Sequence, residues 1–271
     1  MYHNVIKKSL NYTRPLLISR LYYEKKQVTN EISTMIVLNK KGDILTTAKN
    51  ADIFLTCNEY NEIYPPILKE INESKNKSKI EKKYGITNET IVGMHNIIID
   101  ISSNPGDLKI IKHPYLDLAI ISLQNKDGIL VDKFPKFALK TPEVGTSLCS
   151  VGFAFPEYKA FKYDEELYQI TSNFQFMNFP IFPTDGIMCR NIADKEDKVT
   201  MFEMSNRIVT GQEGGPIFNQ KSQLVGMITG YRNIYDKSGN IKLGIGINNT
   251  TIMKFLDDNN IEYEVENEKE K

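Results

Sequence analysis

The chain has 271 residues, of which 41% are hydrophobic and 25% charged, with 34 basic and 34 acidic side chains. This apolar fraction is enough to bury a core, which excludes a wholly disordered chain. A formal net charge of zero gives no electrostatic basis for nucleic acid or an anionic membrane as the main partner.

The termini and cysteines suggest where the protein works. The first residues include lysines but no apolar segment after them, and no stretch approaches the roughly 18 apolar residues of a membrane helix. Cys57, Cys149 and Cys189 are odd in number and lack metal-ligand spacing, so we expect reduced, mostly buried thiols. The sequence therefore predicts a cytoplasmic protein without a signal peptide, metal or cofactor.

The first part of the chain is predicted to form an arm followed by a β-hairpin. Residues 1–29 are expected to be an N-terminal arm in which Arg14–Ile18 is a short buried piece. The apolar runs Met35–Leu38 and Ile44–Thr47 flank the turn sequence Asn39–Gly42. Two apolar runs around such a turn are typical of antiparallel strands.

The lysine-rich segment Pro65–Tyr84 is predicted to be a helix. Pro66 suits a helix start and Gly85 a helix end, and four apolar side chains are spaced as on one helical face: Ile67, Leu68, Ile71 and Ile80. A solvated surface helix is favoured over a basic binding element.

Further apolar runs predict strands in the second half of the chain. The runs are Leu224–Gly230 and Leu243–Ile247. Thr250–Asp258 is predicted to be a short closing helix capped by Thr250 or Thr251. Residues 261–271 are expected to be a charged, frayed tail.

A glycine-rich segment, Gly211–Pro216, precedes these two strands. Glycine accepts positive φ angles and lets a ligand approach main-chain N–H groups closely. The segment is therefore predicted to be a tight turn leading into a strand.

Three motifs occur in an order that resembles the trypsin-like (chymotrypsin-fold) serine peptidases, especially the HtrA type. The motifs are Thr47-Ala48-Lys49, Asp117-Leu118-Ala119-Ile120 and Gly211-Gln212-Glu213-Gly214-Gly215-Pro216. Leu118–Ile121, Gly145–Gly152 and Thr184–Met188 resemble further strands of this family. The resemblance extends from about Thr34 to Phe255. It implies an all-β fold of two six-stranded antiparallel β-barrels with one inserted helix and a short C-terminal helix. The peptidase domain would span 30–260, with the first barrel at about 30–130 and the second at about 135–250.

The same resemblance implies that the catalytic triad is degenerate. Where the family has His, Asp and Ser, this chain has Lys49, Asp117 and Glu213. Triad catalysis needs a hydroxyl nucleophile and a base that can accept its proton. A glutamate has no hydroxyl to activate, and a lysine is charged at neutral pH unless strongly desolvated. We therefore expect no catalytic residues and an inactive homologue.

Two interpretations of the replaced residues stay open. Lys49 and Glu213 are of opposite sign, so Lys49 is expected to pair with Glu213, Asp117 or both; the alternative is neutral drift in an unused site. His113 lies four residues before Asp117 on a predicted loop, where a chemical role is not expected.

The resemblance also implies a binding groove. The main-chain N–H groups of Gly211 and Glu213 would form an oxyanion hole able to bind a carbonyl, a peptide carboxylate or the carboxylate of Glu213 itself. Arg207 falls at the floor of the side-chain pocket, where it would select acidic residues, unless it is simply exposed. Gln212 replaces an aspartate that extracellular members use during activation by cleavage, which argues against such activation.

The peptide itself is expected along Gly226, Met227, Ile228, Thr229 and Gly230. The sequence therefore predicts a trypsin-like pseudoprotease that binds a peptide or protein segment as a regulatory or scaffold module. The alternatives are a hydrolase with unorthodox catalytic residues and a structural subunit of a larger assembly.

Overall fold

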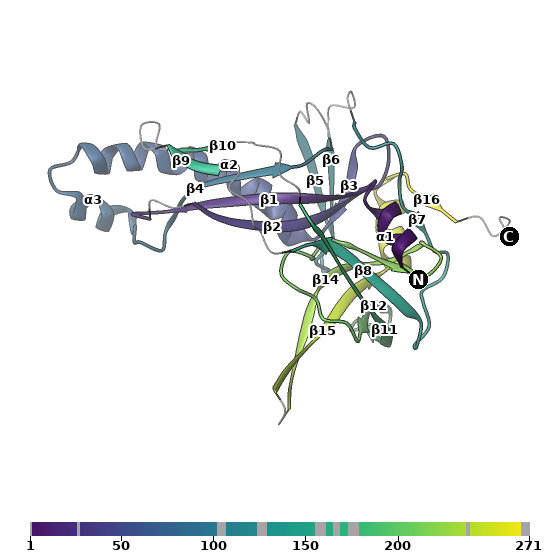
Figure 1. Cartoon of the computed structure of the whole chain (residues 1–271). Helices are drawn as coiled ribbons and strands as arrows, with labels where there is room; N and C mark the ends of the chain where they lie inside the picture. Colours follow the sequence, from purple (N-terminus) through teal and green to yellow (C-terminus); the bar gives the residue numbers. More distant parts are fainter. Residues whose placement is uncertain are drawn as a thin grey trace.

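The structure is a computed structural model that describes residues 2–25, 28–101, 107–123, 129–154, 161–164, 169–172, 179–236 and 239–266. Two curled β-sheets form most of the molecule, and helices lie on their outer sides (Figure 1). This arrangement confirms the predicted all-β fold class.

The first sheet is antiparallel, with the strand order β4-β1-β2-β3-β6-β5. Its strands are β1 (Thr13–Tyr22), β2 (Val28–Val37), β3 (Asp43–Thr46), β4 (Ile91–Ile98), β5 (Leu108–Lys112) and β6 (Ala119–Leu123). The predicted hairpin is confirmed, because Ile36 pairs with Leu45 and Val37 with Ile44. Within the described ranges no pairing joins β4 to β5. The first sheet is thus a half-barrel rather than the closed barrel that we expected.

The N-terminal segment is a part of this sheet rather than a separate arm. A short helix, α1 (His3–Ser9), precedes β1, and β1 pairs with β2 on one side and β4 on the other. Leu16 and Leu17, which face opposite sides of the strand, are both fully buried. A strand buried on both faces lacks the alternation that reveals strands in a sequence, which is why β1 was missed.

The inserted helical region begins much earlier than predicted. Helix α2 (Ala48–Glu73) starts directly after β3 and contains Pro65 and Pro66 in its interior, and α3 (Lys77–Tyr84) follows. The prediction of a single helix starting at Pro66 was therefore wrong, because α2 ends at Glu73 and a second helix follows. The predicted end at Gly85 is confirmed as the end of α3. A proline pair normally interrupts a helix, but Leu68 and Ile71 beyond it are buried. Packing of the distal turns thus maintains the helix through both prolines.

The second sheet contains a closed barrel. Its order is β13-β8-β11-β12-β15-β14-β7-β16, and an additional pairing of β13 with β14 joins the ends of the first six strands. Its strands are β7 (Lys136–Phe137), β8 (Ser147–Phe153), β11 (Ile181–Ala193), β12 (Val199–Met204), β13 (Pro216–Asn219), β14 (Leu224–Asp236), β15 (Gly239–Asn248) and β16 (Glu264–Val265). A separate hairpin consists of β9 (Phe161–Asp164) and β10 (Gln169–Ser172). The predicted strands of this half are confirmed.

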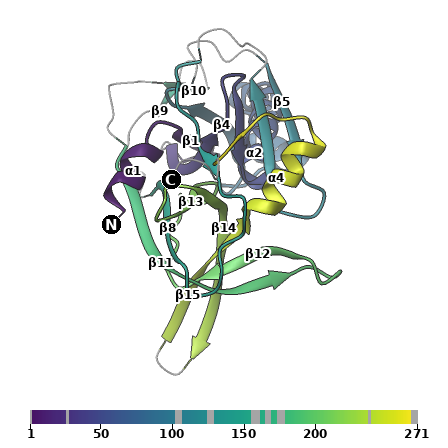
Figure 2. The ribbon, with the colours of Figure 1, turned by 90° about the vertical axis from the view of Figure 1, so that its right-hand side faces the viewer.

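Helix α4 (Asn249–Asp258) follows β15 and packs beside the first sheet (Figure 2). Its cap is Asn248, whose Oδ1 accepts from the Thr251 N–H at 2.7 Å, rather than Thr250 or Thr251 as predicted. Asparagine is as effective a cap as threonine, so the sequence alone does not separate the neighbouring candidates. Part of the expected tail is ordered as β16, which pairs with β7.

One large apolar cluster joins the two sheets. It includes Met35 and Ile120 from the first sheet, Val151 and Met227 from the second, and Phe255 from α4. A second cluster, around Phe202, fills the barrel of the second sheet. The shared cluster fixes the position of the first sheet against the glycine-rich turn of the second.

Candidate functional site

The turn Gly211–Pro216 has a compact main-chain conformation that requires glycine at two positions. Gly211 and Gly214 have φ angles of +104° and +87°. A Cβ on Gly214 would lie 2.2 Å from the carbonyl oxygen of Thr34. Glycine is therefore required, because other residues rarely adopt a positive φ angle and their Cβ atom would clash with the Thr34 carbonyl. Within the turn, the Gly215 N–H donates to the Gln212 carbonyl at 2.9 Å.

The first sheet holds this turn through buried hydrogen bonds. The carbonyl of Glu213 accepts from the Thr34 N–H at 3.2 Å, from the Ser33 Oγ at 3.1 Å and from the Asn50 Nδ2 at 3.2 Å. Thr34 Oγ1 also donates to the Gly211 carbonyl at 2.7 Å. Strand β2 and the first turn of α2 therefore fix the main chain of the turn from the opposite sheet.

The side chain of Glu213 folds back onto the turn. Its Oε2 accepts from the N–H of Gly211 at 3.1 Å. The Gly211 N–H is one of the two donors expected for an oxyanion hole. The group bound to it is the carboxylate of Glu213 itself, which was one of the three ligands considered for that hole. In this conformation that donor is unavailable to a carbonyl or carboxylate from another molecule.

Lys49 and Asp117 meet at the start of α2. Register pairing of Thr46 with Ala119 places Asp117 beside the first helical turn. Asp117 Oδ1 accepts from the Lys49 main-chain N–H at 3.0 Å, and its Oδ2 lies 3.5 Å from Lys49 Nζ. Asp117 therefore supplements the Thr47 cap, because a carboxylate at a helix N-terminus is stabilised by free N–H groups and the helix dipole.

The expected ion pair of Lys49 forms with Asp117. Both residues and Glu213 are described, and no ion pair between Lys49 and Glu213 occurs among the described side chains. The Lys49 side chain is 82% exposed and that of Asp117 is 20% exposed. Exposed pairs of this kind contribute little to stability.

His113 has a structural environment. Its Nδ1 accepts from the main-chain N–H groups of Tyr115 and Leu116, at 3.2 and 3.1 Å, and its ring packs edge-on against Phe255. Burial lowers the pKa of its imidazole. Through these contacts His113 holds the loop before β6 in place, which is a structural role.

The expected groove residues differ in their surroundings. Arg207 is exposed and no hydrogen bond or ion pair of its side chain occurs within the described part of the chain. Thr229 and Gly230 are partly exposed at a bulge in β14. Beyond Ile228, the only pairing of β14 among the described strands is with β15.

Met227 and Ile228 are fully buried, and β14 is paired on both sides at these residues. The Ile228 N–H and carbonyl bind Gly215 and Gly214, each at 2.8 Å. A Cβ on Gly226 would meet the ring of Phe202, in the barrel core. Gly226, Met227 and Ile228 are therefore inaccessible to a ligand, and the accessible edge of β14 begins at Thr229.

The residues that hold the turn were missed by the sequence reasoning. None of them belongs to a motif: Ser33 and Thr34 precede the apolar run Met35–Leu38, and Asn50 follows Thr47-Ala48-Lys49. Gln212 is fully buried, and its amide binds the Val209 N–H and the Phe182 carbonyl. One available signal was the polar Ser33-Thr34 pair directly before the apolar run Met35–Leu38.

Three other properties bear on the site. Cys57 and Cys149 are buried free thiols, and Cys189 is a partly exposed one. Within the described ranges, no three His, Cys, Asp or Glu side chains are grouped to hold a metal ion. No helix in the described part of the chain is long and apolar enough to cross a membrane.

The fold is similar to those of solved proteases. The protease Rv3671c from M. tuberculosis in its active form has a TM-score of 0.53 and 13% identity, over 97% of this chain and 86% of that chain. Its inactive form has a TM-score of 0.50 and 12% identity, over 94% and 92%. The HtrA-type protease AlgW with a tripeptide has a TM-score of 0.50 and 12% identity, over 95% and 63%.

Such low identities show a common fold alone. The predicted chymotrypsin-like fold is therefore confirmed, with the second sheet as a closed barrel and the first as a half-barrel. Searches against descriptions of known protein families and against curated proteins find no match.

Proposed function

We propose that this protein is a catalytically inactive trypsin-like serine protease homologue that binds a peptide or protein segment, as a regulatory or scaffold module in the cytoplasm. The observation that carries the proposal is the hydrogen bond between the Glu213 carboxylate and the Gly211 N–H. A side chain without a hydroxyl occupies the centre of the turn and also covers one of its anion-binding donors.

The surroundings of Lys49 support the loss of catalysis. Acyl transfer by this type of site needs a hydroxyl, a base in contact with it, and donors free to bind the developing oxyanion. Lys49 pairs instead with Asp117 and extends into solvent. Neither Lys49 nor Glu213 is therefore arranged to perform the steps of a triad.

The free side of β14 supports the binding role. From Thr229 onwards this strand is exposed and pairs with β15 alone among the described strands. Strand addition draws affinity from main-chain hydrogen bonds and needs no nucleophile. We place the peptide antiparallel to Thr229–Tyr231, one step beyond the residues expected from the sequence. Arg207, whose side chain has no hydrogen-bond or ion-pair partner among the described residues, would attract an acidic side chain.

Labelling by a fluorophosphonate probe tests the absence of catalysis. Neither the wild-type protein nor the single reversions Lys49→His and Glu213→Ser should react or cleave casein, because triad members act as a unit. Stoichiometric labelling of the wild type that one Ser or Thr substitution abolishes would instead identify an unorthodox hydrolase.

Amide NMR shifts with a blocked peptide, acetyl-Val-Glu-Val-amide, test the binding site. Shifts should cluster at Thr229–Tyr231, and Arg207→Glu should weaken binding about tenfold through charge repulsion. Lys221→Glu is the matched control, because it makes the same charge change on an exposed turn and should leave affinity nearly unchanged. Equal effects of the two variants would remove Arg207 from the site. Shifts confined to α3 would contradict the proposed edge.

A further inference from the structure

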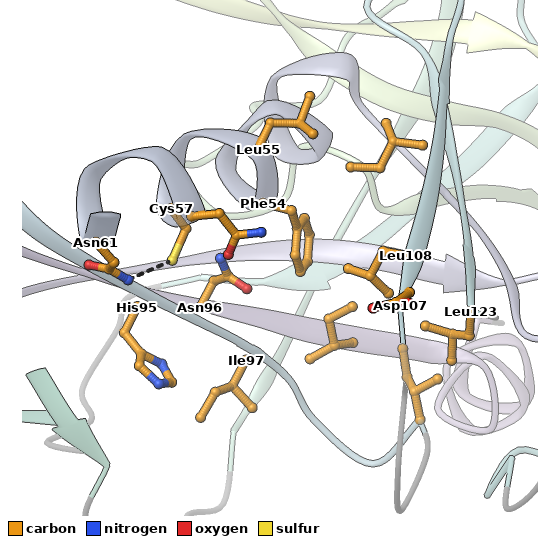
Figure 3. A pocket seen from close by; sticks show the side chains of 14 residues that line it. Phe54, Leu55, Cys57, Asn61, His95, Asn96, Ile97, Asp107, Leu108 and Leu123 are labelled. Atoms are coloured by element: carbon orange, nitrogen blue, oxygen red, sulfur yellow. Dashed lines mark hydrogen bonds between the residues drawn. The ribbon is translucent and has the colours of Figure 1, made fainter. Parts of the chain in front are cut away.

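A pocket of about 800 Å³ lies where the first sheet does not close (Figure 3). Helix α2, β4 and β5 surround it, and Leu123 of β6 lies at one end. Residues from both faces of β4 line it, His95 and Ile97 from one face and Asn96 and Ile98 from the other. Since successive residues of a strand point to opposite faces, a pocket that contacts both must follow the outer edge of the strand.

The outer edge of β4 already binds an amide group. Asn61 of α2 donates its Nδ2 to the Met94 carbonyl at 2.6 Å, and its Oδ1 accepts from the Met94 N–H at 3.1 Å. The side-chain amide thus replaces the main chain of a neighbouring strand at Met94. The next position that points outward is Asn96, beside the Cys57 thiol.

Ile98 is the following outward position, because outward main-chain groups recur at every second residue of an edge strand. Ile99, its neighbour, faces the other way and donates its N–H to Pro15. No described residue binds the N–H or carbonyl of Ile98. Within the described part of the chain, the donor and the acceptor of Ile98 therefore have no partner and lie side by side at the pocket.

The walls of the pocket combine apolar side chains with the amides of Asn58, Asn61 and Asn96, and the carboxylate of Asp107 lies beside Leu108. Phe54 and Leu108 face the space together with Ile97 and Ile98, and Leu55 nearby is 53% exposed. Burial raises the pKa of the Cys57 thiol and lowers that of the His95 imidazole, so both groups favour their neutral forms. The volume is within the range of ligand pockets, about 300–1,000 Å³.

We propose that this pocket binds a short, uncharged, apolar peptide segment in extended conformation, which hydrogen-bonds the outer edge of β4 at Ile98. An extended peptide presents an N–H and a carbonyl on one side at the spacing of a strand, which matches Ile98. Its side chains would pack on the isoleucine and leucine walls. The site is separate from β14 and independent of the proposed loss of catalysis.

Titration of the full chain with acetyl-Leu-Val-Leu-amide, followed by amide NMR, tests the proposal. Shifts are expected at Ile97, Ile98 and Leu108, with little change at Thr229–Tyr231. The same peptide methylated on its valine and C-terminal leucine main-chain nitrogens lacks the donors that strand addition requires, and should bind at least about tenfold more weakly. No binding at about 5 mM, shifts at β14, or equal affinity for both peptides would each overturn the proposal.

A matched pair of variants tests the contact at Ile98. Ile98→Pro removes an N–H that points away from β1, which an edge strand tolerates, and should weaken binding about tenfold. Ile98→Val keeps the N–H and should change affinity no more than about threefold. Equal affinities of the two folded variants would overturn the assignment to Ile98. If Ile98→Pro does not fold, the methylated peptide decides the question on the wild-type protein.

Discussion

The two sides of the candidate site are held in different ways. The turn Gly211–Pro216 is bound by buried donors from Ser33, Thr34 and Asn50, whereas the Lys49–Asp117 pair is largely open to solvent on the lysine side. Side-chain chemistry at Lys49 can therefore change at little cost to folding. A change in the main-chain conformation of the turn should cost more stability, because the hydrogen bonds from the first sheet depend on that conformation.

The largest expected effect is that of Gly214→Ala. The substitution combines a φ of +87° with a contact of 2.2 Å to the Thr34 carbonyl, and should lower the free energy of unfolding by about 3 kcal/mol or more. Gly85→Ala is the control, because Gly85 also has positive φ but has nothing within 4 Å of an added Cβ. It should cost only about 1 kcal/mol. Urea unfolding measures both, and equal losses would show that packing at the turn adds nothing.

Asn50→Ala should have the next largest effect. It leaves Ser33 Oγ and the Glu213 carbonyl with fewer buried partners, which should cost about 2 kcal/mol. Asn58→Ala, on an exposed position of the same helix, should stay within about 0.5 kcal/mol. A loss at Asn50 no larger than at Asn58 would contradict the idea that the first sheet holds the turn.

Asp117→Ala should destabilise by about 1 kcal/mol, because it removes an acceptor from the first turn of α2. Asp117→Asn retains a side-chain oxygen and should lose less. Thermal unfolding at equal protein concentration compares the two. Identical losses would show that charge, rather than the hydrogen bond to the Lys49 N–H, is what Asp117 contributes.

Lys49→Ala should have the smallest effect, about 0.3 kcal/mol, and the effect should disappear at high salt. The reason is the exposure of the lysine side chain, which leaves the pair open to solvent on that side. A loss of about 3 kcal/mol or more would instead indicate a buried pair whose removal leaves an uncompensated carboxylate.

Much of the architecture was determined by the sequence. The hairpin around Asn39–Gly42 and the strands β14 and β15 follow from apolar runs between turn residues, whereas β7, β12 and β16 were not predicted. The glycines of the turn follow from the need for positive φ. The motif order placed Lys49 just after β3 and Asp117 just before β6, which made Asp117 one of the two partners expected for Lys49.

Other features depend on contacts between distant parts of the chain. Burial on both faces makes β1 a strand, and packing of Leu68 and Ile71 carries α2 through Pro65 and Pro66. Local patterns do not encode either effect. The sequence also left the partner of Lys49 and the occupant of the Gly211 donor open.

Tertiary structure decided both questions. The register of β3 with β6 brings Asp117 to Lys49, and the turn lets Glu213 reach the Gly211 N–H. Pairing of Ile228 with the turn moves the accessible edge of β14 to Thr229. The open side of the first sheet follows from the lack of pairing between β4 and β5 within the described ranges. The sequence of a strand shows that its edges can pair with other strands. Only the assembled sheet shows which edges have a neighbouring strand.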